Sequence, residues 1–251
     1  MRTTTTGPVP VPDADGAARR LIARWEELPG RAAIFDFNGT LSNDEPILLQ
    51  LYTELFRRRL GWALTPAAYY ARLAGRSDRE IVETAIAEVG GGEHLLDELL
   101  AERHARYAEL VALQSPIPGP AVSTVAGLSA AGVPLGIVTG AQRADVELVL
   151  APSALGGLFR ALVTEEDVQT GKPDPEGFQL AANALGCSPA RILVFEDSIP
   201  GVRAAKAAGM LCVGVEGTLP RDQLAREADA VVSGIAPTLF ASLARTETTT
   251  A

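Results

Sequence analysis

IFDFNGTL, at residues 34–41, places the carboxylate of Asp36 directly after a run of β-prone apolar residues. Two other segments carry charged side chains that we expect at the same site. TGKPDPEGF contains Lys172, and ILVFEDS ends its apolar run with Glu196 and Asp197. We expect these side chains at the carboxyl ends of strands, where open α/β sheets bind their ligands. If the strands lie side by side, one pocket holds three acids and one ammonium group. Such a pocket suits a divalent cation and a phosphoryl group.

The composition indicates a globular chain with a substantial core. Its 251 residues are 47% hydrophobic and 5% aromatic, which suits a compact, helix-rich α/β protein with one core or two smaller ones. The formal net charge of -9 and the pI near 4.8 argue against an extended cationic face. Because nonspecific nucleic-acid binding requires such a face, we expect no nucleic-acid partner.

Cysteine usage and the chain ends bear on the location of the protein. Cys187 and Cys212 form neither a CxxC pair nor a disulfide framework, which fits a reducing cytoplasm. The first residues are rich in Thr, Pro and Asp and lack the apolar core of a secretory signal, and no later run approaches a membrane span. We therefore predict a cytoplasmic protein without a membrane partner, with disordered residues at 1–16 and 246–251.

The order of the predicted elements indicates a Rossmann-like core that is interrupted by a helical cap. Residues 31–37 form a buried strand in this prediction. Helical patterns without a convincing strand fill residues 46–117, which we assign to the cap. One cap helix begins with the capping-box pattern of Ser77 and Glu80. The stretch SPIPGP, at 115–120, is helix-breaking and returns the chain to the core.

The predicted core occupies residues 17–45 and 118–245. After the return the chain alternates between helices and strands, which demands right-handed crossovers and a parallel sheet covered on both faces. The predicted helices lie at 18–28, 120–131, 142–150, 175–185, 200–208, 220–227 and 236–244, and the later strands at 133–139, 160–163, 191–196, 211–215 and 230–232.

From about Arg31 to Gly217 the sequence resembles the haloacid dehalogenase superfamily. It is most similar to the subgroup with a helical cap inserted after the first motif, which includes β-phosphoglucomutase-like and phosphatase-like members. All four family motifs occur in order, with family-like spacing. The resemblance implies hydrolysis through an aspartyl-phosphate. By this resemblance Asp36 is the nucleophile, Thr139 the phosphate-binding hydroxyl, Lys172 the phosphate-binding cation, and Glu196 and Asp197 the acids around Mg²⁺.

The chemistry of these residue types agrees with such roles. A carboxylate that attacks phosphorus splits hydrolysis into two steps, but it faces a dianion and needs strong positive compensation from Lys172 and Mg²⁺. For Mg²⁺ we expect one oxygen of Asp36, the main-chain carbonyl of Asn38 and the carboxylate of Asp197, with Glu196 bound through water. Two alternatives stay open: the acid pair caps the helix that follows it, and Lys172 is a solvated loop cation.

Further substrate contacts are expected on both sides of the site. Thr139 ends the run PLGIVTGA, and Gly140 presents its amide at a helix start, an anion-binding arrangement that is also an ordinary strand-to-helix turn. In the cap segment LAGRSDREI, Arg76 and Ser77 are candidates for binding a polar substrate. Their alternative role is that of a solvated helix start.

Asn38 departs from the pattern of the phosphatases and phosphomutases that the chain resembles. Those enzymes carry an aspartate there, which protonates the leaving oxygen and later activates water, and an amide does neither. A general acid or base is worth about 10² to 10⁴ in rate. Four explanations stay open: an acidic leaving group, proton donation by Asp44 or Glu45, a binding protein with little turnover, and an engineered substitution.

These residues predict a Mg²⁺-dependent phosphatase that hydrolyses a small phosphorylated metabolite through an aspartyl-phosphate on Asp36. The alternative is a low-turnover or noncatalytic protein that binds a phosphorylated ligand. A sugar phosphomutase is disfavoured, because Leu48 and Ala74 stand where similar mutases carry a substrate-handling histidine and a cap lysine. We expect a monomer or a homodimer.

Overall fold

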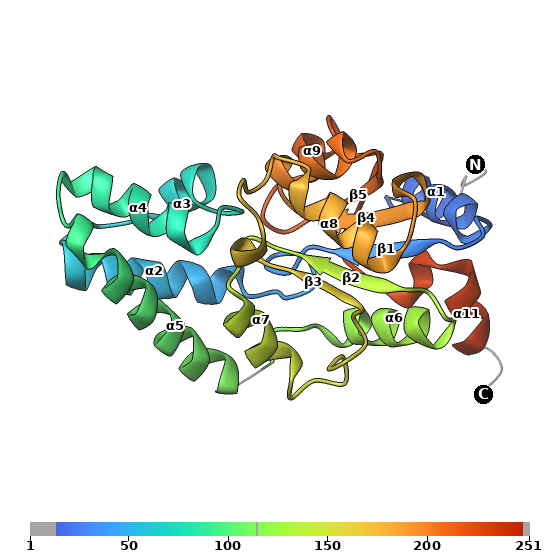
Figure 1. Cartoon of the computed structure of the whole chain (residues 1–251), viewed down its shortest axis with the longest axis horizontal. Helices are drawn as coiled ribbons and strands as arrows, with labels where there is room; N and C mark the ends of the chain where they lie inside the picture. Colours follow the sequence, from blue (N-terminus) through green and yellow to red (C-terminus); the bar gives the residue numbers. More distant parts are fainter. Residues whose placement is uncertain (1–13, 114, 248–251) are drawn as a thin grey trace, which may run out of the picture.

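Strand β1, Ala32–Phe35, has the composition of a central strand, because all four of its residues are apolar and fully buried. The computed structural model describes residues 14–113 and 115–247, and within them six parallel strands form one sheet in the order β3-β2-β1-β4-β5-β6 (Figure 1). β1 lies where the strand order reverses, which is the usual ligand-binding position of such sheets. The other strands are β2 (Leu135–Val138), β3 (Ala161–Val163), β4 (Ile192–Glu196), β5 (Leu211–Val215) and β6 (Ala230–Val232).

The register of three strands brings their carboxyl ends to one level. Phe35 pairs with Ile137 of β2 and with Phe195 of β4, and the rings of Phe35 and Phe195 stack with their centroids 5.3 Å apart. Asp36 directly follows Phe35, and Glu196 directly follows Phe195. Parallel pairing in this register therefore sets the two carboxylates side by side at one edge of the sheet.

Helices cover both faces of the sheet (Figure 1). Side chains alternate along β1, so that Ala33 and Phe35 enter one apolar core while Ala32 and Ile34 enter the other. The predicted α/β class with a Rossmann-like sheet is thereby confirmed. The first core is covered by α1 (Gly16–Glu26), α6 (Gly119–Ala130), α7 (Arg143–Leu150) and α11 (Ala241–Glu247), and the second by α8 (Glu176–Leu185), α9 (Ile199–Ala207) and α10 (Arg221–Leu224).

Between β1 and α6 the chain forms a helical insert that stands beyond one end of the sheet (Figure 1). The hydroxyl of Thr65 accepts a hydrogen bond from the amide of Ala68 (3.2 Å), and Ser77 forms the full capping box with Glu80 that the sequence predicts. These two caps start successive helices, and the second lies at the residue that the sequence pattern predicts. The insert comprises α2 (Glu45–Leu60), α3 (Pro66–Arg72), α4 (Asp78–Val89), the 3₁₀ turn η1 (Glu93–Leu95) and α5 (Leu96–Leu113).

Predicted and observed elements of the core agree in kind and order, with two differences near its end. The predicted helix at 236–244 is a 3₁₀ turn, η4 (Pro237–Leu239), followed by α11. The helix is interrupted because Phe240 adopts extended backbone angles, φ -109° and ψ 120°. The predicted helix at 220–227 is reduced to the single turn α10. Both differences lie away from the carboxyl ends of β1 and β4.

The structure describes only part of each predicted disordered end. Residues 1–13 and 248–251 of the two predicted disordered ends lie outside the described residues. Asp15, which the structure does describe, accepts a hydrogen bond from Arg221 (2.9 Å) and so connects the start of α1 to α10. In residues 14–113 and 115–247, no helix is both long enough and apolar enough to traverse a lipid bilayer.

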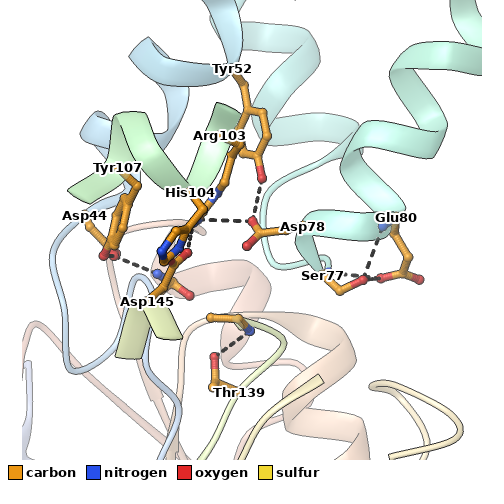
Figure 2. A network of polar contacts seen from close by, with 12 residues as sticks. Asp44, Tyr52, Ser77, Asp78, Glu80, Arg103, His104, Tyr107, Thr139 and Asp145 are labelled. Atoms are coloured by element: carbon orange, nitrogen blue, oxygen red, sulfur yellow. Dashed lines mark hydrogen bonds and ion pairs between the residues drawn. The ribbon is translucent and has the colours of Figure 1, made fainter. Parts of the chain in front are cut away.

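Arg103 of α5 forms a buried link between the insert and the core (Figure 2). Its side chain is 1% exposed, and its guanidinium forms ion pairs with Asp78 at the start of α4 (3.2 Å) and with Asp145 of α7. Tyr52 donates a hydrogen bond to Asp78 (2.5 Å), and His104 contacts Asp145. Because a buried charge needs a partner, Arg103 is what allows two carboxylates to be buried where the insert meets the core.

Arg103→Met preserves the apolar stem of the side chain but leaves Asp78 and Asp145 without their shared cation. We expect the substitution to lower the free energy of unfolding by about 3 to 5 kcal/mol. Chemical denaturation measures this loss. The matched control on the same helix is Arg106→Met, whose exposed guanidinium pairs with Glu109 (2.6 Å) and contributes less than about 1 kcal/mol. Equal losses in the two variants would contradict the role assigned to Arg103.

Candidate active site

Three carboxylates converge at the carboxyl ends of β1 and β4. Asp36 follows β1, Glu196 is the last residue of β4, and Asp197 comes next. Their nearest oxygens all lie within 4.8 Å of one another, and their side chains are buried. The structure thus brings together the acids that the sequence analysis singled out. Three acids at this separation repel one another unless positive charge lies among them.

Lys172, in the loop before α8, reaches into the acid cluster. Its Nζ donates hydrogen bonds to Asp36 Oδ1 (2.6 Å) and Glu196 Oε1 (2.5 Å), and its side chain is 12% exposed. Burial lowers the pKa of Lys172, but the two carboxylates outweigh this effect and raise the pKa above its ordinary value. The lysine is therefore held charged inside the site. The alternative of a solvated loop cation is wrong for this residue.

One ammonium group does not compensate three buried acids. Burial, with a further contribution from Glu196, raises the pKa of Asp36 to about 7 even though Lys172 opposes the shift. Burial and then the charges of Glu196 and Asp36 also raise the pKa of Asp197. Both carboxylates are thus held in a setting that disfavours their negative charge. A bound cation would relieve this cost.

The donor set fits a hard divalent cation such as Mg²⁺. All three side chains offer oxygen atoms, and Oδ2 of Asp197 is buried without a hydrogen-bond partner. The turn after β1 leaves the space that this oxygen needs, because a Cβ atom on Gly39 would lie only 2.1 Å from it. Gly39 also has φ +73°, a left-handed conformation that favours glycine.

Glu196 also supports the start of α9. Its Oε2 accepts hydrogen bonds from the amide of Ser198 (2.8 Å) and from the Ser198 hydroxyl (2.9 Å), and that hydroxyl accepts the amide hydrogen of Gly201 (3.2 Å). A Cβ atom on Gly201 would lie 1.7 Å from Glu196 Oε1, so glycine is required there. The helix-capping alternative therefore describes part of what Glu196 does, while Ser198 is the N-cap residue and Asp197 remains in the acid cluster.

The loop of the insert before α4 lies directly on the core. A Cβ atom on Gly140 would lie 3.5 Å from the Cα atom of Ser77, and one on Gly75 would lie 3.0 Å from the Cβ atom of Ser198. Thr139, before Gly140, accepts a hydrogen bond from the amide of Ala141 (3.1 Å). The insert consequently closes over the acid cluster from the side opposite the sheet.

The two predicted cap contacts lie in different places. Arg76 lines the small cavity that also contains Asp36 and Lys172, and no hydrogen bond or ion pair of its side chain occurs within the described part of the chain. Ser77 instead bonds to Glu80 (3.0 Å) as a helix cap and borders a neighbouring groove. The cavity measures about 30 Å³, room for about one or two water molecules.

Asn38 is held by a buried acid rather than by solvent. Its Nδ2 donates to Asp44 Oδ2 (2.6 Å), which also accepts the hydroxyl of Tyr107 (2.6 Å; Asp44 and Tyr107 are labelled in Figure 2). Burial raises the pKa of Asp44, while its hydrogen bonds with Tyr107 and Asn38 oppose the shift. The side chain of Asp44 is fully buried, so it sits behind Asn38 and does not line the cavity.

Glu45 is the second of the two acids that the sequence named as proton sources, and it does line the cavity with Asp36. It accepts a hydrogen bond from the hydroxyl of Tyr69 (2.9 Å). Burial, assisted by the charges of Asp44 and other acids, raises the pKa of Glu45 to about 7. A carboxyl group with this pKa exchanges protons near neutral pH.

Sequence reasoning missed Asp78 as part of the site. Asp78 lines the same cavity and is 5% exposed. In the sequence it is the first residue of a helix with a strong capping box, a position where an acid is ordinary and solvated. Its burial depends on Tyr52 and Arg103, which lie 26 and 25 positions away in the chain, so no local pattern reveals it.

Comparison with known proteins agrees with this geometry. Residues 31–209 match the family model of haloacid dehalogenase-like hydrolases. The chain is 37% identical to validoxylamine A 7'-phosphate phosphatase of Streptomyces hygroscopicus subsp. limoneus, across 82% of this chain and 94% of that protein. It is 32% identical to the fructose-1-phosphate phosphatase YqaB of Escherichia coli, across 72% and 94%.

Solved structures share the fold. CbbY from Rhodobacter sphaeroides, in complex with phosphate, superposes with a TM-score of 0.74 at 24% identity, covering 82% of this chain and 95% of that one. The β-phosphoglucomutase of Clostridium difficile superposes with a TM-score of 0.72 at 19% identity, covering 82% and 91%. These likenesses extend to the insert as well as to the sheet, given the share of each chain that is covered.

Glu45→Gln tests the environment of this acid through the pH dependence of stability. The folded-state pKa, about 7, lies above the ordinary value of 4.5, so the folded protein binds this proton more tightly than the unfolded chain does. The wild-type protein should therefore lose stability relative to Glu45→Gln as the pH rises from about 4.5 to 7, by up to about 3 kcal/mol. Denaturant titrations in metal-free buffer measure the difference. A difference that does not change with pH would contradict the buried, shifted carboxyl group.

Proposed function

The chain belongs to the haloacid dehalogenase-like hydrolase family, and from that premise we propose that it is a Mg²⁺-dependent phosphatase of a small phosphorylated metabolite. The observation that carries the proposal is the contact of Lys172 with Asp36 beside the unpartnered oxygen of Asp197. This arrangement offers a nucleophile, a fixed cation and a place for a metal within one cavity. The two relatives described above, both named as phosphatases, support the same reaction class.

In the proposed reaction a carboxylate oxygen of Asp36 attacks phosphorus, the bond from phosphorus to the leaving oxygen breaks, and an aspartyl-phosphate forms. Lys172 offsets the negative charge that the phosphoryl group brings, and the hydroxyl of Thr139 with the amide of Gly140 binds phosphoryl oxygens. Water then hydrolyses the acyl phosphate and frees Asp36. Bound Mg²⁺, held by Asp36, Asp197 and the main-chain carbonyl of Asn38, with Glu196 through water, would supply further charge compensation.

We assign to Glu45 the proton that the leaving oxygen needs. Asn38 has no proton to give at neutral pH, and Asp44 is fully buried behind it. Glu45 lines the cavity, and its pKa of about 7 leaves a large protonated fraction near neutral pH. The acid is thereby supplied by the first turn of α2 instead of by the turn after β1.

The insert serves in this proposal as a cap that opens to admit substrate. A cavity of about 30 Å³ is too small for a phosphorylated metabolite, so Gly75 and Ser77 must move away from the core before binding. The two connections to the cap lie side by side, because the amide of Asn43 donates to the carbonyl of Pro116 (2.9 Å). We take residues 46–117 as the cap. A cytoplasmic location and a monomer or homodimer remain our expectations.

The alternative function is a binding protein with little turnover, and the locked amide of Asn38 is the observation that favours it. Inorganic phosphate and Mg²⁺ would then raise the melting temperature, while no phosphate monoester, alkyl or aryl, would release phosphate. Phosphate release that Asp36→Asn abolishes would decide for the enzyme. The same variant controls for a contaminating phosphatase.

The proton assignment predicts how Glu45→Gln affects two classes of substrate. Alkyl phosphates have poor leaving groups and need the proton, so their kcat should fall by about 10² to 10⁴. Aryl phosphates leave as stable phenolates, so their kcat should fall much less. The measurement is steady-state phosphate release from glycerol 3-phosphate and p-nitrophenyl phosphate in the presence of Mg²⁺.

A second variant makes this test specific. Asn38→Asp restores a carboxyl group after the nucleophile, so adding it to Glu45→Gln should recover alkyl phosphate hydrolysis. If Glu45→Gln slows both esters equally, Glu45 is not the proton donor. If the wild-type protein already cleaves only the aryl ester, the acid is missing altogether.

A further inference from the structure

A groove runs along the boundary between the insert and the core, next to the phosphoryl site. Its volume, about 710 Å³, falls in the range of small-molecule sites. We call it the boundary groove. It shares Thr139, Gly140 and Lys172 with the small cavity, so the two spaces adjoin at the place where the phosphoryl group is expected. A leaving group too large for the small cavity has this groove as its neighbouring space.

Two carboxylates without full compensation mark the junction of these spaces. Asp78 lines the small cavity from the insert, and its Oδ2 is buried without a hydrogen-bond partner. Glu165 lines the boundary groove from the core, and its Oε2 is likewise buried and unpartnered. Burial and then the charge of Asp78 raise the pKa of Glu165 to about 7. The charge of Asp78 therefore acts on Glu165 across the boundary.

The cations nearby do not neutralise this pair. Arg103 is the ion-pair partner of Asp78, but it shares its one charge with Asp145 (Figure 2). Arg79 lies on the wall of the groove and lowers the pKa of Glu165, yet its ion pair is with exposed Glu83 (3.8 Å). Arg76 and Lys172 also line these spaces, but acids outnumber cations on both walls. The groove has Glu80, Glu165, Glu166 and Asp174 against Arg79 and Lys172, and the small cavity has five acids against Arg76 and Lys172.

The remaining acids of the groove are already engaged in local structure. Glu80 bonds to Ser77, Glu166 accepts the amide hydrogen of Arg143 (3.1 Å), and Asp174 accepts that of Glu176 (2.9 Å). Their oxygens serve helix starts and loops. Asp78 and Glu165 differ from them, because each has a buried oxygen left over for a ligand.

We infer that the leaving group of the substrate binds in the boundary groove and at its junction with the small cavity, and that this site selects a leaving group with a protonated amine. Glu165 in the groove and Asp78 in the small cavity would accept its N–H groups. This inference rests on the proposed phosphatase function and names the class of its substrate. A leaving group with a carboxylate or a second phosphate would meet like charge and unpaired buried acids, which is a strong basis for rejection. Arg76 lines the small cavity, where the transferred phosphoryl group is expected.

The test uses three phosphate esters of one sugar skeleton with different charges: glucosamine 6-phosphate, glucose 6-phosphate and 6-phosphogluconate. We expect kcat/KM to fall in that order, by about tenfold or more between the first and the last. Where an ester is not turned over, its inhibition constant against p-nitrophenyl phosphate hydrolysis gives the ranking. Asp78→Asn and Glu165→Gln should each reduce the ratio of kcat/KM for glucosamine 6-phosphate to kcat/KM for 6-phosphogluconate by about threefold or more.

The controls separate this inference from the proposed function. Glu88→Gln removes an exposed acid from the same helix as Asp78, where its ion-pair partner is Arg72 (2.7 Å), and should leave the ratio unchanged. Glu165→Gln lies outside the Arg103 network, so it keeps the test valid if Asp78→Asn does not fold. A protein that hydrolyses p-nitrophenyl phosphate but ranks the esters equally, or prefers 6-phosphogluconate, overturns the inference alone. A protein that hydrolyses no ester and binds the three equally overturns both.

Discussion

The contact of the Lys172 ammonium with Asp36 and Glu196 is the interaction on which the rest of the structure depends. It requires the β1–β4 register that places Phe35 beside Phe195, since only then do the residues that follow lie together. It also requires glycine at two turns, because a side chain at Gly39 or Gly201 would occupy the space of the acids. After the charge of Lys172 is counted, the site still has an excess of negative charge, and this excess makes it suited to a divalent cation.

The cap adds a second group of buried charges to the first. Arg103 joins the insert to α7 and, through Asp78, reaches the wall of the cavity, so that cap position and cavity lining are set by one network (Figure 2). The amide of Asn38 donates to the carboxylate of Asp44, six residues further along, so the core fixes this side chain at the edge of the cavity. Asp44 does not line the cavity, but the next residue, Glu45, does, and it is the first residue of α2. The proposed proton donor and the start of the proposed cap therefore lie in the same turn of α2.

Much of this fold can be predicted from local sequence patterns. The run before Asp36, the capping box of Ser77 and Glu80, and the alternation after residue 118 each follow from short-range rules, and the structure agrees with them. The site's acids were predictable because parallel strands end at one edge. The buried pairing of Asp78 with Arg103 was not, because only the packing of α4, α5 and α7 brings Asp78, Arg103 and Asp145 together. The shifted pKa of Glu45 was not either, because it comes from burial and from the long-range contact with Tyr69 of α3. The break at Phe240 is of the same kind: helical periodicity continues across it, and only tertiary packing decides the backbone.

The most direct test of the central claim is chemical trapping of the nucleophile. Acetyl phosphate has a leaving group that needs no proton, so it should phosphorylate Asp36 whether or not Glu45 is the acid. After incubation with Mg²⁺ and acid quenching, peptide mass spectrometry should find one added phosphoryl group on the peptide that contains Asp36, and none in Asp36→Asn. Release of phosphate without this adduct under rapid quenching, or an adduct on another residue, would contradict the account.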